Sequence, residues 1–328
     1  MTNLLDVADL TVHFQSDAGA IEAVDHINFS IRRGEVVGLV GESGSGKSVT
    51  SFAILRLIRR PGEIKSGSVR FEGVDLATLS EEQMRRIRGA KIAMISQSPR
   101  TALNPVIPVG KQISRLFRLH EGLSARVAEK RMLDMLDLVR IPDPRRRAGQ
   151  YAHQLSGGMC QRIMIAMALA TSPRLLIADE PTTGLDVSIA ARILDLLREL
   201  GAKTGAAIML ITHDLGVVAE ICDRVVVMHA GQVVEAAPVR SIFHAPAHPY
   251  TRALVGSIPR VDRDVAMTPI PGSVPSLLNP PPGCRYVSRC DHATDQCRVA
   301  RPPLESRGQD HDVACYYDIG RQTGGVAA

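Results

Sequence analysis

The chain has 328 residues, of which 45% are hydrophobic and 22% are charged, and its net charge is +5 at pH 7. This length suggests about two domains, and this composition suits a folded protein with a substantial core. Aromatic residues make up only 3%, with no Trp, which disfavours a nucleic-acid module that stacks bases, and no apolar run approaches the roughly 20 residues of a membrane-spanning helix.

The first residues, MTNLLDVADLTVHF, do not resemble a secretory signal, because no basic stretch precedes an apolar one. We therefore expect a cytoplasmic protein. In a reducing compartment, clustered cysteines are expected to be metal ligands or catalytic groups rather than disulfides, and four of the six cysteines lie close together near the end of the sequence.

The pattern along the chain predicts an α/β core. Residues 1–40 alternate short apolar runs with turns, as strands do, and residues 48–58 have helical spacing after a glycine-rich turn. Residues 67–76 indicate a strand pair and residues 107–139 a helical region. Two nearly continuous apolar runs, 174–181 and 206–214, are typical of buried parallel strands, and an amphipathic segment between them predicts the connecting helix.

The composition changes after residue 257, where the Pro-rich stretch IPGSVPSLLNPPPG cannot continue regular structure. We therefore predict one domain over residues 1–257 and a cysteine-rich, irregular extension over residues 258–328. No internal repeat is visible, so the chain is expected to hold a single copy of the α/β core.

The stretch GLVGESGSGKSVT fits the pattern G-x-x-x-x-G-K-[ST] of a phosphate-binding loop, between a predicted strand and a predicted helix. In such a loop the backbone N–H groups surround phosphate oxygens, Lys47 reaches the β- and γ-phosphates, and Ser48 offers its hydroxyl to Mg²⁺. The residues of this stretch that we expect to bind the nucleotide are Gly41, Ser43, Gly44, Ser45, Gly46, Lys47, Ser48 and Val49.

The run LLIADEP delivers two carboxylates, Asp179 and Glu180, to the end of an apolar strand. Alone, this pattern fits an ordinary acidic turn equally well. Beside a phosphate loop, the first carboxylate suits Mg²⁺ and the second suits deprotonation of the water that attacks the γ-phosphate.

A second anion site is predicted at LSGGM, where Ser156 occupies a helix N-cap position before Gly157 and Gly158. The chain already has one phosphate loop. A second phosphate-binding element is explained if it contacts the nucleotide bound by another copy of the domain.

Together these motifs resemble the ATP-binding subunits of ABC transporters. The resemblance implies a P-loop NTPase core with an antiparallel β subdomain and a helical subdomain at about residues 98–170. It also implies an aromatic stack on adenine from Phe14, a Q-loop glutamine at Gln97 that positions Mg²⁺, a D-loop Asp186 and a switch histidine at His213. The cofactors that it implies are ATP and Mg²⁺, and the expected activity is ATP hydrolysis.

Further stretches, TALNPVIPVGKQI, HPYTRAL and IPGSVPSLLNPPPGC, resemble the oligopeptide/dipeptide importer ATPases. In that group an ATPase pair, here expected to be two paralogues, lies at the inner face of the membrane beneath two permeases, and an extracytoplasmic protein captures the substrate. An importer of a nickel chelate or glutathione, a soluble ABC ATPase outside transport, and a metal or redox sensor remain alternatives. We expect no nucleic-acid partner.

Four cysteines in the extension, Cys284, Cys290, Cys297 and Cys315, follow the spacing C-x5-C-x6-C-x17-C. Structural zinc sites and the common ferredoxin motifs begin with tighter pairs, so the spacing alone decides nothing. The irregular segment nevertheless needs a crosslink to fold. The resemblance implies a [4Fe–4S] cluster on these four thiols, with Zn²⁺ as the second choice. Cys160 and Cys222 are expected to lie outside the site.

Overall fold

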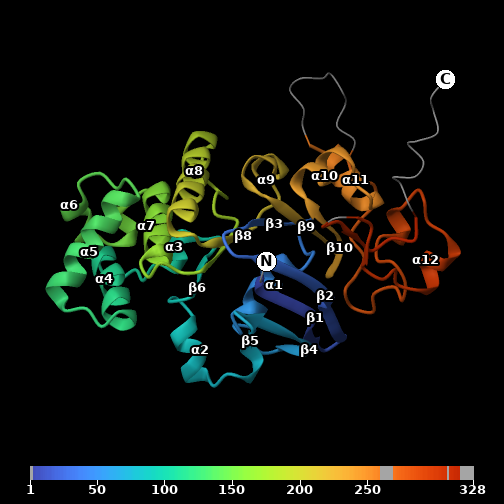
Figure 1. The fold of residues 1–328 in the computed structure, drawn as a ribbon, viewed down its shortest axis with the longest axis horizontal. Helices are drawn as coiled ribbons and strands as arrows, with labels where there is room; N and C mark the ends of the chain where they lie inside the picture. The colour runs from blue at the N-terminus through green and yellow to red at the C-terminus, as the bar shows by residue number, and fades with distance from the viewer. Residues whose placement is uncertain (1–2, 259–268, 309, 318–328) are drawn as a thin grey trace.

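The computed structural model describes residues 3–258, 269–308 and 310–317, which form two sheets with helices around them (Figure 1). The larger sheet has eight strands in the order β11-β12-β10-β9-β3-β8-β7-β6. Its strands are β3 (Val36–Val40), β6 (Ile92–Ile95), β7 (Leu175–Asp179), β8 (Ala207–Ile211), β9 (Arg224–His229), β10 (Gln232–Pro238), β11 (Glu305–Ser306) and β12 (Asp312–Val313). The smaller, antiparallel sheet has four strands in the order β2-β1-β4-β5. They are β1 (Asn3–Ser16), β2 (Gly19–Arg32), β4 (Gly62–Phe71) and β5 (Val74–Asp75).

The predicted parallel strands, β7 and β8, belong to a run of five strands, β6, β7, β8, β3 and β9, that are parallel to one another and extend inward from the β6 edge of the larger sheet. Successive side chains of a strand point to opposite faces. In β7, Leu175 and Ile177 pack toward the antiparallel sheet, whereas Leu176 and Ala178 pack toward the helices. Both faces are buried, which explains why these strands are apolar throughout.

The helices occupy the connections. They are α1 (Lys47–Ile54), α2 (Glu81–Ile87), α3 (Pro99–Ala102), α4 (Val109–His120), α5 (Ala125–Leu138), α6 (Pro144–Ala148), α7 (Gly157–Leu169), α8 (Val187–Thr204), α9 (Leu215–Ile221), α10 (Val239–His244), α11 (Pro249–Gly256) and α12 (Asp295–Val299). Helices α4 to α7 group at one end of the molecule and α12 lies at the other, with the larger sheet between them (Figure 1). The predicted α/β core with an antiparallel sheet is thereby confirmed.

The helix predicted over residues 48–58 is shorter in the structure, because α1 ends at Ile54. Arg56 adopts the left-handed conformation, with φ of 53°, which stops the helix. Its guanidinium donates hydrogen bonds to the carbonyl oxygens of Leu76 and Leu79, at 3.0 and 2.6 Å. These long-range contacts outweigh the local helical pattern of the sequence.

The C-terminal extension packs on the core. Strand β12 pairs with β10, and the Ala314 N–H donates to the Val234 carbonyl at 2.8 Å. The fully buried carboxylate of Glu235 lies 2.8 Å from Nε2 of His311 in the extension. The boundary predicted after residue 257 lies next to residues 259–268, which are outside the described residues.

Candidate functional site

The phosphate loop forms one wall of a cavity of about 420 Å³ between β3 and α1. Four residues from elsewhere complete the lining: Phe14 on β1, Ala23 on β2, and Gln97 and Glu180 from two other loops. The residues that line the cavity are Phe14, Ala23, Ser43, Gly44, Ser45, Gly46, Lys47, Ser48, Val49, Gln97 and Glu180. The cavity therefore collects most of the residues that the sequence predicted to bind the nucleotide.

Two glycines of the loop have no room for a side chain. At Gly41, with φ of 148°, an added Cβ would lie 2.1 Å from the Met228 carbonyl oxygen. At Gly46, with φ of 99°, it would lie 2.6 Å from the Ala23 carbonyl oxygen. The loop thus packs tightly between β2 and β9 and directs its backbone toward the cavity.

Lys47 is buried in this loop and donates to the carbonyl oxygens of Gly41 and Glu42, both at 2.8 Å. Burial lowers the pKa of its ammonium group, and the nearby carboxylates of Glu180, Asp179 and Glu42 oppose that shift. An ammonium group held among phosphate-loop carbonyls can neutralise the charge of bound phosphates.

Ser48 and Asp179 face each other at the start of α1 and the end of β7. The Ser48 hydroxyl donates to the Asp179 carboxylate at 3.2 Å. Burial raises the pKa of Asp179, with the neighbouring Glu180 adding to the shift, whereas the Ser48 hydrogen bond and Lys47 lower it. A hydroxyl and a buried carboxylate are oxygen ligands of the kind that Mg²⁺ prefers.

Glu180 connects the remaining predicted catalytic residues. Its carboxylate accepts a hydrogen bond from Gln97 Nε2 at 2.8 Å and lies 3.2 Å from His213 Nδ1. Thr183, which the sequence analysis did not single out, donates to the same carboxylate at 2.8 Å. Burial would raise the pKa of Glu180, but the hydrogen bonds from Thr183, His213 and Gln97 outweigh it and lower the pKa. The carboxylate is therefore ionised near neutral pH and can accept a proton.

The residues of the second predicted anion site lie outside this cavity. Ser156 is exposed, and its hydroxyl accepts a hydrogen bond from the Met159 N–H at 3.2 Å, so it caps α7 as predicted. A Cβ added to Gly157 would contact nothing within 4 Å, and one added to Gly158 would lie 3.3 Å from Ile189. Asp186 caps α8 by accepting from the Ile189 N–H at 2.9 Å.

Phe14 is half-buried at the cavity wall, on β1 opposite Gly62 of β4. A Cβ added to Gly62 would lie 2.5 Å from the Phe14 ring. The absence of a side chain at Gly62 therefore leaves the space that the ring fills, and the ring borders the same cavity as the phosphate loop.

The four cysteines of the extension line one small cavity of about 10 Å³. Gly283 lets two of their segments pack closely, since a Cβ there would lie 2.2 Å from the Cys297 carbonyl oxygen. Burial raises the pKa of the Cys284 and Cys315 thiols to about 11. The four thiols are not close enough together to form a metal site as they stand. Within the described residues, no three His, Cys, Asp or Glu side chains form a group that could hold a metal ion. Cys160 and Cys222 are buried in the core, away from this cavity.

Comparison with known proteins identifies two families along the chain. The ABC transporter family matches residues 24–183, and the C-terminal region of oligopeptide/dipeptide transporters matches residues 234–297. The first match includes the phosphate loop, the α7 N-terminus and the two carboxylates after β7. The second includes three of the four cysteines in the extension.

Curated relatives are similar over nearly the whole chain. The dipeptide transport ATP-binding protein DppD of Escherichia coli is 48% identical over 98% of this chain and 99% of the relative. A putative peptide import ATP-binding protein of Brucella ovis is 50% identical over 95% of this chain and 96% of the relative. Such identity over this length shows a common family.

Solved structures show the same fold. The ATP-binding cassette MJ0796, determined as a dimer bound to ADP and phosphate, superposes with a TM-score of 0.65 and 28% identity. It covers 72% of this chain and 99% of its own. The protein cbiO1 of Clostridium perfringens, part of the transporter complex cbiONQ, gives a TM-score of 0.62 with 28% identity, covering 75% of this chain and 92% of its own.

Proposed function

The chain belongs to the oligopeptide/dipeptide family of ABC transporter ATP-binding subunits, and from this premise we propose how its residues energise peptide import. It is an ATPase coupled to peptide transport. The observation that supports the proposal is the separation of the two predicted anion-binding elements: the phosphate loop lines the cavity, whereas the capped end of α7 is exposed outside it. One subunit alone therefore leaves Ser156 without a nucleotide to contact.

We propose that two ATPase subunits, expected to be paralogues, pair head to tail around two ATP molecules. Each nucleotide would lie between the phosphate loop of one subunit and Ser156, Gly157 and Gly158 of the other. The open space at Gly157 leaves room for a phosphate to approach the helix N-terminus, where N–H groups favour an anion. Asp186, which is exposed at the N-terminus of α8, is assigned to the subunit interface.

In the proposed mechanism, Glu180 deprotonates the attacking water, and Gln97 and His213 orient the reacting groups. The hydrogen bonds from Gln97 and His213 to Glu180 bring these three side chains together. Lys47 and the loop N–H groups bind the phosphates, and Phe14 is assigned to the adenine. Ser48, Asp179 and Gln97 would hold Mg²⁺, which stabilises charge on the transferred phosphoryl group when bound. Binding of ATP closes the pair and hydrolysis releases it.

We assign the chain to the cytoplasmic face of the membrane, with two permeases and an extracytoplasmic binding protein as further partners. No helix in the described part of the chain has the length and apolar character to span a membrane. Vesicles that contain the complete transporter test this function, because labelled peptide should accumulate inside them only when ATP is supplied. Uptake without ATP would contradict it.

For the extension we propose a [4Fe–4S] cluster on Cys284, Cys290, Cys297 and Cys315, with Zn²⁺ as the second choice. Iron–sulfur clusters are held by cysteine thiolates, and the four thiols proposed as ligands line one enclosed cavity. The cavity of about 10 Å³ must widen, so the thiols would have to rearrange on loading. A bound cluster would crosslink the extension, and its proposed role is to fold this segment and brace the subunit pair.

Protein purified without oxygen is expected to be brown, to absorb broadly in the visible range and to contain about four irons per chain. Changing all four cysteines to Ser should abolish the colour and lower the stability of the extension, because a crosslink is lost. Cys160→Ser, a matched control at a cysteine far from the cavity, should keep the iron. Colourless protein with one zinc per chain would favour the second choice, and a four-Ser variant of unchanged stability would exclude both.

A further inference from the structure

Two arginines flank the first two cysteines of the extension and point into the core. Arg285 follows Cys284, and Arg289 precedes Cys290. Their side chains are only 3% and 2% exposed. A buried arginine needs partners for its charge, and both side chains form ion pairs with carboxylates, although Nε of Arg285 has no hydrogen-bond partner.

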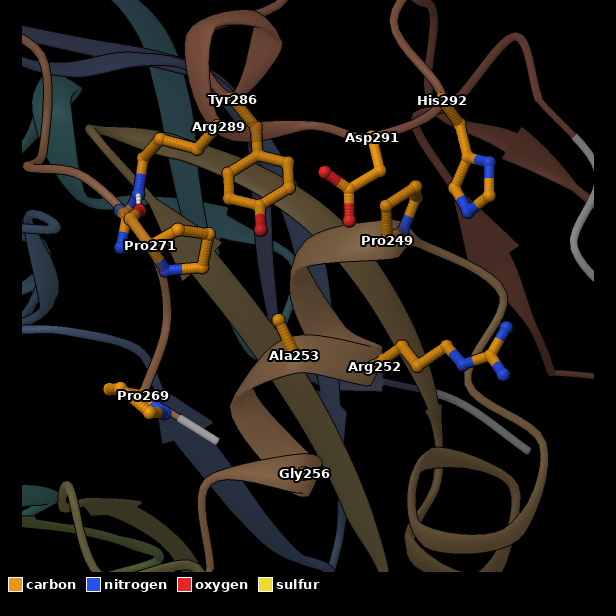
Figure 2. A pocket seen from close by; sticks show the side chains of 10 residues that line it. All are labelled: Pro249, Arg252, Ala253, Gly256, Pro269, Pro271, Tyr286, Arg289, Asp291 and His292. Atoms are coloured by element: carbon orange, nitrogen blue, oxygen red, sulfur yellow. Dashed lines mark hydrogen bonds between the residues drawn. The ribbon is translucent and has the colours of Figure 1, made fainter. Parts of the chain in front are cut away.

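Arg289 reaches the phosphate loop. Its two terminal nitrogens donate to the two carboxylate oxygens of Glu42, at 2.7 and 2.9 Å, which is a bidentate ion pair. Its Nε donates to the Pro271 carbonyl at 2.7 Å, and its guanidinium lies 5.6 Å from the centre of the Tyr286 ring. Arg289 and Pro271 lie close together in Figure 2, whereas Arg252, on α11, extends away from them.

Glu42 is held from three sides. Its backbone N–H donates to the Tyr250 hydroxyl of α11 at 3.0 Å, and its carbonyl accepts from Lys47 Nζ at 2.8 Å. The buried imidazole of His229 packs on the Tyr250 ring, with ring centres 4.4 Å apart, and its Nδ1 lies 3.7 Å from a carboxylate oxygen of Glu42. Arg289 of the extension therefore binds the side chain of Glu42, and the backbone carbonyl of Glu42 accepts a hydrogen bond from Lys47, the lysine expected to bind phosphate.

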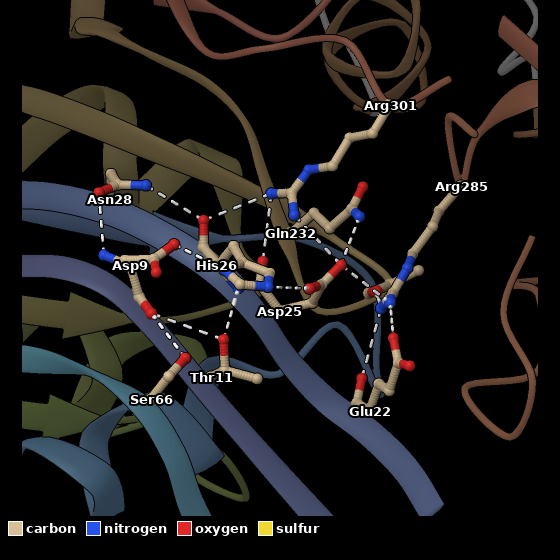
Figure 3. A network of polar contacts seen from close by, with 11 residues as sticks. Asp9, Thr11, Glu22, Asp25, His26, Asn28, Ser66, Gln232, Arg285 and Arg301 are labelled. Carbon is tan, nitrogen blue, oxygen red and sulfur yellow. Dashed lines mark hydrogen bonds and ion pairs between the residues drawn. The ribbon is translucent and has the colours of Figure 1, made fainter. Parts of the chain in front are cut away.

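Arg285 contacts strand β2 beside the nucleotide cavity, and Figure 3 shows its guanidinium next to Glu22 and Asp25. It forms ion pairs with Glu22 and Asp25, which flank the cavity-lining Ala23 on β2. It also donates to the Ala230 carbonyl at 2.6 Å. The next residue, Gly231, donates its N–H to the Ser45 carbonyl of the phosphate loop at 3.0 Å.

The Arg289–Glu42 ion pair also affects ATP binding, because Glu42 carries a negative charge in the phosphate loop. The Arg289 hydrogen bonds lower the pKa of Glu42, so this carboxylate is ionised at neutral pH. An unpaired carboxylate in a phosphate loop would repel a triphosphate, because like charges in a partly buried site are weakly screened. Arg289 neutralises this charge and at the same time fixes the loop.

We propose that Arg289 is a positioning residue for ATP binding, through which the nucleotide site depends on the folded cysteine segment. The 3₁₀ turn Val287–Arg289 ends directly at Cys290, so a displacement of that cysteine moves the arginine backbone. Through the Arg289–Glu42 ion pair, the affinity for ATP depends on the extension, and this role is separate from bracing the subunit pair. Its effect belongs to each single chain and does not depend on the permeases.

Binding of a fluorescent ATP analogue with Mg²⁺ to the full-length chain tests this role. Arg289→Ala should raise the Kd by about tenfold, which is the usual effect of losing a charge-assisted hydrogen bond. Arg289→Lys, which keeps the charge and loses the bidentate geometry, should raise it less and covers the case in which the Ala variant does not fold. Arg252→Ala, a matched control at an exposed arginine of α11, should bind as the unchanged chain does.

Two double variants distinguish charge neutralisation and coupling from a general loss of structure. Glu42→Gln added to Arg289→Ala should recover part of the affinity, because it removes the unpaired charge. Cys290→Ser alone should raise the Kd, and it should add nothing in the Arg289→Ala background. In the assembled transporter, Arg289→Ala should raise the KM for ATP and leave kcat within about twofold. Unchanged affinity in both the Ala and Lys variants, or no recovery with Glu42→Gln, would overturn the proposal.

Discussion

Replacing Glu180 with Gln is expected to slow ATP hydrolysis by about 10²- to 10⁴-fold while ATP binding persists. Gln has the size of Glu and cannot take a proton from water. In the proposed mechanism, nucleotide binding depends on Lys47 and the loop backbone, which the substitution leaves unchanged. The carboxylate accepts hydrogen bonds from Gln97 and Thr183 and lies beside His213, so the change acts at the centre of the candidate catalytic group.

Steady-state phosphate release and nucleotide retention by the assembled complex measure the two effects separately. The Glu180→Gln complex should hold ATP and stay closed. Glu199→Gln, at an exposed residue of α8 that pairs with Lys203, is the matched control and should hydrolyse ATP at the ordinary rate. Ordinary turnover in Glu180→Gln would remove Glu180 from the role of general base.

Ser156→Arg is expected to separate ATP binding from hydrolysis in a different way. Ser156 is exposed and lies outside the cavity of its own chain, so the isolated variant should bind ATP almost as tightly as the unchanged chain. In the assembled pair, the bulky side chain would occupy the space needed by the partner's nucleotide. ATP-dependent pairing and hydrolysis should therefore both fall sharply.

Two comparisons make this result interpretable. The substitution also removes the hydroxyl that caps α7, which costs about 1 kcal/mol of stability and is seen as a lower melting temperature. Lys47→Ala provides the reference for a direct loss of ATP affinity. If isolated Ser156→Arg lost affinity as severely as Lys47→Ala, the assignment of Ser156 to the partner's nucleotide would be wrong.

The α/β core could be predicted because its signals are local. The apolar runs at β7 and β8 are buried on both faces, and glycine-rich turns mark the start of helices. The end of α1 could not be predicted, because Arg56 leaves the helical conformation and donates to carbonyl groups 20 and 23 residues further along the chain. The pairing of β12 with β10 likewise depends on residues distant in sequence.

The candidate nucleotide site followed from contiguous motifs, and the structure gathers Gln97, Glu180 and His213 from three separate loops. Thr183 and Tyr250 were missed, because neither stands in a pattern that indicates its hydrogen bond. The Arg289–Glu42 ion pair joins residues 247 positions apart, and no local spacing indicates it. The cysteine spacing left the choice of metal open, and the small cavity that the thiols share does not decide it.

ATP-dependent uptake of a labelled dipeptide tests whether this chain energises peptide import. The measurement uses sealed vesicles that contain this chain, its partner ATPase and both permeases, with the binding protein and peptide outside and ATP enclosed. Accumulation of the peptide should require ATP and should be lost in the Glu180→Gln complex. Hydrolysis of ATP at an ordinary rate without accumulation of peptide, or equal accumulation in the Glu180→Gln complex, would contradict this function.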